Sequence, residues 1–189
     1  MKNSAKKYVA FLRGINVGGK VMLPMKELAV LCEKASLENV RTYINSGNVL
    51  FESELNEDAL RTKIEAVLEK KMERKMDVVI RTPEELETIL KKNPFPNENP
   101  SQVGVILFAD PISKAAAREL ELAETSSPTK EKIACSKRET YIYYPVGMGQ
   151  TKLKMPSSTR VGTARNINTI TKLIALSAEA VKPAKAKKV

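Results

Sequence analysis

The sequence predicts an α+β protein built from two ferredoxin-like units in tandem, each with an antiparallel or mixed sheet that carries its helices on one face. Two observations lead to this prediction. The order of strands and helices in residues 1–92 starts again after residues 93–102, and each half contains a hairpin next to a strand with a helical crossover. We therefore expect an N-terminal domain at 1–92, a linker at 93–102 and a C-terminal domain at 103–181. The residues show no strict repeat, so the duplication concerns the order of elements only.

The first half reads as strand, helix, hairpin, helix, strand and helix. Residues 8–12 (YVAFL) are typical of a buried strand, and residues 24–35 place apolar side chains at helical spacing after Pro24. Residues 40–44 and 49–53 are rich in β-formers and flank the polar turn NSGN, which indicates a hairpin. A helix is expected at 56–72 and a strand at 77–80. Thr82 and Glu85 form a capping-box pattern that predicts a further helix.

The stretch NPFPNENP, with three prolines and three asparagines in eight residues, is the linker signal. Beyond it we expect strands at 103–109, 132–136 and 140–145, and helices at 113–123 and 163–178. A long loop rich in Gly, Lys and Pro lies before the last helix. The final eight residues, KPAKAKKV at 182–189, have four lysines and no apolar anchor, so a disordered basic tail is expected.

Composition excludes several classes of function. The 189 residues contain no histidine, which removes the usual base of hydrolase triads. Two distant cysteines offer no zinc spacing and no disulfide framework, and we expect Cys32 in the core. The apolar segments are too short for a signal peptide or a membrane span. The sequence thus predicts a cytoplasmic protein with no metal and no cofactor.

The net charge of +10 is unevenly distributed. Residues 1–100 have 17 basic and 15 acidic side chains, whereas residues 101–189 have 15 and 7. A clustered positive field attracts polyanions, so an anionic partner is expected on the second half.

The segment FLRGINVGGKV raises the possibility of a phosphate loop. Gly14, Gly19 and Lys20 match most of the pattern GxxxxGK[ST], but Val21 stands at the hydroxyl position. Pro24 also places the helix start about four residues after the lysine, whereas a phosphate loop needs the helix to begin at the motif. A plain loop, in which the glycines supply positive φ angles and Arg13 and Lys20 are solvated, is the alternative.

The helix expected at 163–178 has an apolar face and a polar face. At 100° per residue, its polar arc holds Arg165, Asn168, Thr169 and Lys172. An arginine in a first helical turn is unfavourable unless an anion is present, and amides and a hydroxyl can bind phosphate, sugar or carboxylate. A solvated surface is the alternative for this arc.

Four ordered motifs, RGINVGGK with PMKEL, VRTYINSGNVLFES, YPVGMGQTKL and GTARNINTITKL, resemble a bacterial family catalogued as domain of unknown function 1697. The resemblance covers about residues 8–176 and implies ferredoxin-like units, a bacterial cytoplasmic protein and no established activity. The resemblance also implies candidate ligand-binding residues, which are Arg13, Gly14, Asn16, Gly18, Gly19, Lys20, Asn45, Ser46, Gly47, Asn48, Lys152, Thr163, Arg165, Asn166, Asn168, Thr169 and Lys172. Ile167 departs from the family's aromatic residue, and the segment around Met155 and Pro156 is shortened.

Three functional hypotheses stay open at this point. In the first, the glycine loop, the NSGN turn and the Arg165 helix converge near the junction of the halves on a phosphate-bearing ligand, either a nucleotide or a nucleic acid. In the second, a histidine-independent enzyme uses Lys20, Lys152 or Ser46 on a small phosphorylated or acyl substrate. In the third, the basic half and tail bind polyanions or an acidic protein nonspecifically.

Overall fold

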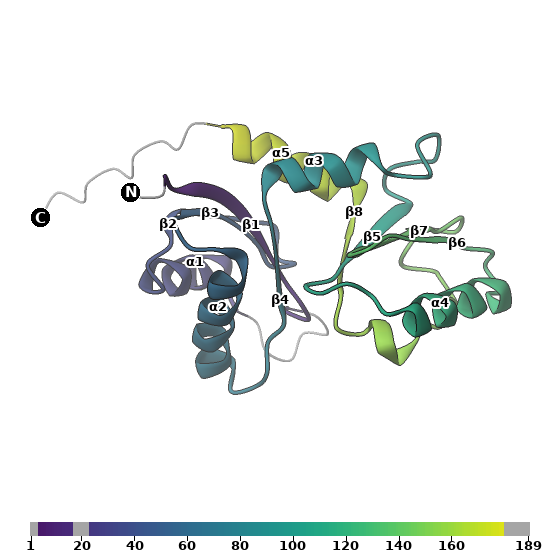
Figure 1. Ribbon diagram of the computed structural model, residues 1–189, viewed down its shortest axis with the longest axis horizontal. Helices are drawn as coiled ribbons and strands as arrows, with labels where there is room; N and C mark the ends of the chain where they lie inside the picture. Colours follow the sequence, from purple (N-terminus) through teal and green to yellow (C-terminus); the bar gives the residue numbers. More distant parts are fainter. Residues whose placement is uncertain (1–3, 17–22, 180–189) are drawn as a thin grey trace, which may run out of the picture.

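The computed structural model describes residues 4–16 and 23–179 of the chain (Figure 1). The first half forms a four-stranded antiparallel sheet with the strand order β2-β3-β1-β4. Helix α1 connects β1 with β2, and helix α2 connects β3 with β4. The elements of this unit are β1 (Lys6–Leu12), α1 (Met25–Lys34), β2 (Glu38–Tyr43), β3 (Asn48–Ser53), α2 (Glu57–Met72) and β4 (Val78–Arg81).

The second half repeats this topology with the strand order β6-β7-β5-β8, again with antiparallel pairs. A loop with a short 3-10 helix, η1 (Ser157–Thr159), stands where the first unit has its second helix. The elements are β5 (Val103–Leu107), α4 (Lys114–Ser126), β6 (Lys132–Cys135), β7 (Glu139–Tyr143) and β8 (Thr163–Asn166). The prediction of two tandem ferredoxin-like units is confirmed.

The first sheet is buried on both faces. Ala10 and Leu12 belong to the core beneath α1 and α2, whereas Val9 and Phe11 belong to a second core on the opposite face. Successive side chains of a strand point to opposite faces, so the uninterrupted apolar run of β1 fits a sheet covered on both sides. Sequence patterns had indicated helices on one face only.

The second core joins the two halves of the chain. Helices α3 (Pro83–Lys91) and α5 (Ile167–Ala178), which follow the last strand of each unit, pack against each other above the junction (Figure 1). Their apolar faces meet side chains of both sheets in one cluster, which includes Val9, Phe11, Val105, Tyr141, Leu86, Ile89, Ile170 and Leu173. No helix in the described ranges is long and apolar enough to cross a membrane.

The local signals at α3 hold as predicted. The Thr82 hydroxyl accepts a hydrogen bond from the Glu85 amide at 3.2 Å, and Glu85 Oε2 accepts one from the Thr82 amide at 2.8 Å. This reciprocal pair is the expected capping box, and it fixes the point where β4 ends and α3 begins. Cys32 lies in the core with 2% of its surface exposed, as expected.

The start of the last helix was predicted wrongly. Residues 163–166 form β8, which pairs with β5, and α5 begins at Ile167 with Asn166 as its N-cap. Four residues are too few to show the alternating pattern of a strand, and here a helix follows them directly. The strand is defined only by its pairing with β5, which the sequence does not reveal. Arg165 therefore lies on a strand, and only 7% of its surface is exposed.

Candidate functional site

Arg165 lies at the centre of a cluster of hydrogen bonds where β1 ends, next to the β2–β3 turn of the first unit. We call this cluster the Arg165 hub. Its Nη2 donates to the carbonyl oxygens of Ser46 at 2.7 Å, Leu12 at 3.1 Å and Gly47 at 3.3 Å. Its Nε donates to Asn48 Oδ1 at 2.6 Å. Its Nη1 donates to the Thr163 hydroxyl and the Ala164 carbonyl. The guanidinium also lies over the Phe11 ring, 5.7 Å from its centre. Every nitrogen of this side chain is thus engaged by the protein, so Arg165 does not present free donors to a ligand.

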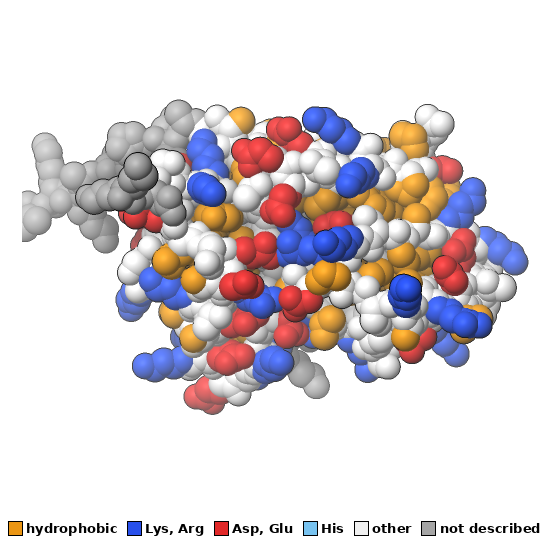
Figure 2. Space-filling view, in the orientation of Figure 1, with side chains coloured by type: hydrophobic (Ala, Val, Ile, Leu, Met, Phe, Trp, Pro, Cys, Tyr) orange, Lys and Arg blue, Asp and Glu red, His pale blue; other side chains and the backbone are white. Residues whose placement is uncertain are grey.

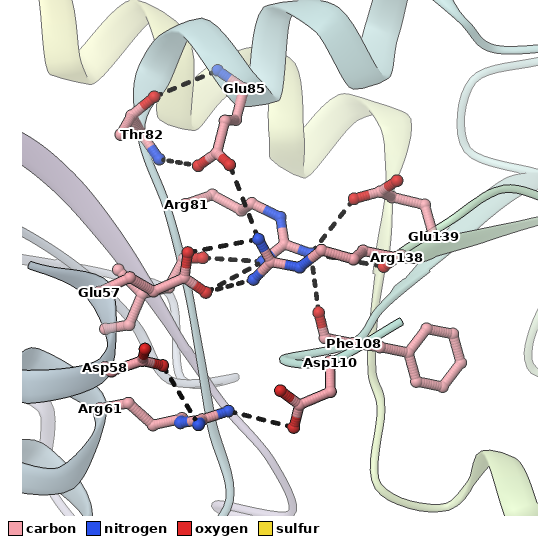
Figure 3. A network of polar contacts seen from close by, with 11 residues as sticks. Glu57, Asp58, Arg61, Arg81, Thr82, Glu85, Phe108, Asp110, Arg138 and Glu139 are labelled. Atoms are coloured by element: carbon pink, nitrogen blue, oxygen red, sulfur yellow. Dashed lines mark hydrogen bonds and ion pairs between the residues drawn. The ribbon is translucent and has the colours of Figure 1, made fainter. Parts of the chain in front are cut away.

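Arg81, which is 1% exposed, forms a second hub at the other unit (Figure 3). Its Nη2 donates to the carbonyl oxygens of Phe108 at 2.8 Å and Arg138 at 3.4 Å, and to Glu139 Oε1 at 3.2 Å. Its Nη1 donates to the Ile80 carbonyl at 2.8 Å. A side chain of the first unit therefore binds the backbone of the second.

The two arginines occupy equivalent positions in the two units. Arg81 on β4 faces Val9 on β1, and Arg165 on β8 faces Val105 on β5. Each is followed by the N-cap residue of the next helix, α3 or α5. Each guanidinium crosses to the other unit and binds one carbonyl at the end of its first strand and at least one in the turn of its hairpin. The two units are therefore joined by a reciprocal exchange of arginine side chains.

The charge around the two hubs is not symmetric. Arg81 lies 3.2 Å from the Glu139 carboxylate and 3.8 Å from that of Glu57. The neighbouring Arg138 pairs with Glu57 and lies 3.8 Å from Glu85. Figure 2 shows acidic and basic side chains side by side at this junction. Arg81 is thus surrounded by charges of both signs.

Arg165 has no such carboxylate among the described residues. Asn48 stands at the position equivalent to Glu139, and the first turn of α5 contains no acidic residue, whereas that of α3 contains Glu84 and Glu85. The sequence has no Asp or Glu between Glu139 and Glu179. Burial lowers the pKa of Arg165 to about 10. The Arg165 side chain is consequently a buried cation without a compensating negative side chain nearby.

The bend after β1 holds three of the candidate residues. Arg13 pairs with Asp77 at 3.1 Å, and Gly14 has a φ of 63°, which glycine adopts without strain. Asn16 bonds the Leu23 backbone through both side-chain atoms, at 2.7 and 3.0 Å, and so joins the two ends of the loop. The candidates between them, Gly18, Gly19 and Lys20, lie outside the described residues.

The β2–β3 turn lies next to this bend and carries four more candidates. The Asn16 side chain donates to the Asn45 carbonyl at 3.1 Å. Gly47 has a φ of 77°, and its carbonyl accepts from both Leu12 and Arg165. Asn48 is fully buried, and its side chain donates to the Ser46 hydroxyl. The described part of the bend, the turn and Arg165 are therefore in contact, through interactions that hold the backbone.

The first turns of α5 present the remaining candidates of this region. Asn166 caps the helix by accepting from the Thr169 amide at 2.9 Å, and Thr163 is buried against Arg165. Asn168 and Lys172 are exposed, and Thr169 is half-buried. These three side chains form the accessible part of the predicted polar arc.

Lys152 is not part of this arrangement. Its amide donates to the Thr129 hydroxyl at 3.0 Å, just before β6, and β6 is the sheet edge opposite β8. Among residues 4–16 and 23–179, no group of three or more His, Cys, Asp or Glu side chains could hold a metal ion.

The role of Arg81 and its network was not predicted from the sequence. One signal could have revealed it, because an arginine stands directly before the N-cap residue in both RTPEE at 81–85 and RNINT at 165–169. The significance of this pair depends on which strands meet, and no local pattern gives that information.

Residues 5–141 match the model of a family described as "Protein of unknown function (DUF1697)". Among solved structures, the chain is similar to the conserved bacterial protein SP0830 from Streptococcus pneumoniae, with a TM-score of 0.73 and 22% sequence identity. The similarity covers 92% of this chain and 99% of that one. None of the curated proteins compared with the chain matches it.

Proposed function

Because the chain belongs to the DUF1697 family, whose description names no activity, we propose its function from its own geometry: it binds a phosphate-bearing ligand at the first turns of α5, beside the β2–β3 turn. We call this region the α5 site and define it by Asn168, Thr169 and Lys172 on the helix and Asn45 and Ser46 on the turn. A nucleotide and a nucleic acid both carry such a phosphate.

The uncompensated charge of Arg165 is the observation that carries this proposal. At the equivalent place of the other unit, the carboxylates of Glu84 and Glu85 occupy the first turn of α3. The α5 site has Asn168 and Thr169 at these two positions, and neither repels an anion. A bound phosphate at the α5 site would supply the negative charge that the protein itself supplies around Arg81.

The polar groups of the α5 site suit a phosphate. The Asn168 amide and the Thr169 hydroxyl can donate hydrogen bonds, and Lys172 adds an exposed cation one turn further along the helix. The positive end of the helix dipole and the buried Arg165 charge favour an anion without direct contact, because both act through a medium of low dielectric constant.

The experiment that tests the proposal installs the missing carboxylate. Thr169→Glu reproduces the residue at the equivalent position of α3, and Ala175→Glu adds the same charge to an exposed position two turns along the same helix. Binding of inorganic phosphate, pyrophosphate, mononucleotides and short oligonucleotides is measured by thermal shift and calorimetry. We expect Thr169→Glu to weaken binding about tenfold, which corresponds to roughly 1.4 kcal/mol, and Ala175→Glu to weaken it much less.

Thr169→Glu should fold normally, because a glutamate at this position completes a capping box with the N-cap. Binding should also weaken as the salt concentration rises. Whether mononucleotides or oligonucleotides bind more tightly shows which of the two supplies the phosphate. The proposal is wrong if no phosphate compound binds, or if the two variants weaken binding equally.

A further inference from the structure

A groove of about 480 Å³ lies between the two units, away from the α5 site. One side is formed by α2 and the segment leading into β4, and the other by the loop after β5 and the residues around η1. This volume falls within the usual range for small-molecule sites. Nothing in the proposed phosphate site uses this groove.

The groove has apolar surface that the fold leaves uncovered. Pro111 and Val161 line it with exposed side chains, Val161 with 61% of its surface exposed, and Ile112 lines it half-buried. Exposed aliphatic surface inside a groove favours contact with an apolar group.

Most charged groups along the groove are already paired. Asp77 pairs with Arg13 at 3.1 Å, and Asp110 pairs with Arg61 at 3.3 Å. These two pairs leave no net charge for a ligand to neutralise.

Two groups remain, and they have opposite charge. Lys75 is exposed and makes no ion pair with any part of the chain that the structure describes. Glu65 accepts from the Val78 amide at 3.0 Å through Oε1, and its side chain makes no other hydrogen bond within the described residues. Burial raises the pKa of Glu65, and this effect outweighs the lowering by the Val78 amide and by the nearby charge of Arg61.

We infer that this groove binds a zwitterion with an apolar side chain, namely an apolar amino acid or a short apolar peptide. Its ammonium group pairs with Glu65, its carboxylate pairs with Lys75, and its side chain packs on Pro111, Ile112 and Val161. A simple anion would be repelled by Glu65, and a simple cation would be repelled by Lys75. The two charges together therefore favour a ligand that carries both signs.

Calorimetry and amide NMR with leucine and a leucine dipeptide test the inference on the full chain. Glu65→Gln keeps an oxygen that can accept from Val78 and removes the charge, and Lys75→Gln removes the other charge. Lys70→Gln on the exposed side of α2 is the matched control. We expect each groove variant to weaken leucine binding about tenfold, and the control to leave it unchanged.

Blocked ligands separate the two charges. N-acetyl-leucine, which lacks the ammonium group, should lose no affinity in Glu65→Gln, and leucinamide should lose none in Lys75→Gln. The inference is overturned if neither leucine nor the dipeptide binds. It is equally overturned if Glu65→Gln and Lys75→Gln bind leucine like the wild type. Binding of inorganic phosphate is measured in parallel, and its outcome concerns only the α5 site.

Discussion

Replacement of Arg165 by methionine should destabilise the protein strongly. It should leave the surface of the protein almost unchanged, because the side chain is buried. Arg165 is 7% exposed and makes six hydrogen bonds, five of them to acceptors other than its neighbour Ala164. Methionine keeps much of the apolar stem but has no donor, so the acceptors in the hub must find other partners.

The loss of folding free energy depends on which hydrogen-bond acceptors are left without any donor. Gly47 O keeps its bond from the Leu12 amide at 2.8 Å, and Leu12 O keeps a weak one from Thr163 at 3.4 Å. Ser46 O and Asn48 Oδ1 accept from no other described group. The orphaned acceptors, Asn48 Oδ1, which is buried, and Ser46 O, which is part-buried, cost up to about 1–3 kcal/mol each, and removal of an uncompensated buried cation offsets part of this. We expect a net loss of about 2–4 kcal/mol.

Urea unfolding followed by circular dichroism measures this loss. The core shared by α3, α5 and both sheets predicts one cooperative transition, so a change in midpoint at constant slope reports stability. Arg160→Met, at an exposed position in the same segment, is the control and should change stability by less than about 0.5 kcal/mol. A loss below about 1 kcal/mol for Arg165→Met would refute the idea that this side chain holds the turn and the bend in place.

Two further predictions concern the turn and a buried carboxylate. Gly47→Ala should lower stability by about 1–3 kcal/mol in urea unfolding, because φ is 77° and the new methyl group would overlap Ile15. Gly149→Ala, which meets open space at ordinary φ, should be nearly neutral, and equal effects of the two would contradict this reasoning. Burial alone would raise the pKa of Glu131, but hydrogen bonds from Ser127, Thr129 and Thr151 outweigh it and lower the pKa to about 2. The folded carboxyl therefore holds its proton less tightly than the unfolded one, so its stabilisation is complete above about pH 4.5 and is lost as the pH falls toward 2. Thermal melts between pH 7 and 2 should fall less steeply for Glu131→Gln, and parallel curves would count against the prediction.

The sequence by itself determined the elements that depend on neighbours in the chain. The strand at β1, the β2–β3 hairpin and the capping box of α3 each follow from a period, a turn composition or a cap, all of which act within a few residues. The same signals gave the tandem ferredoxin-like fold and the resemblance to the family.

Only the tertiary structure decided what the candidate residues do. Arg165 was expected on an exposed helical face, and it lies on a strand inside the protein because β8 exists only through its pairing with β5. The exchange with Arg81, the charge difference between the two hubs and the groove between the units all arise where segments distant in sequence meet. Burial and charge compensation depend on these long-range contacts, and a local pattern of residues carries no information about them.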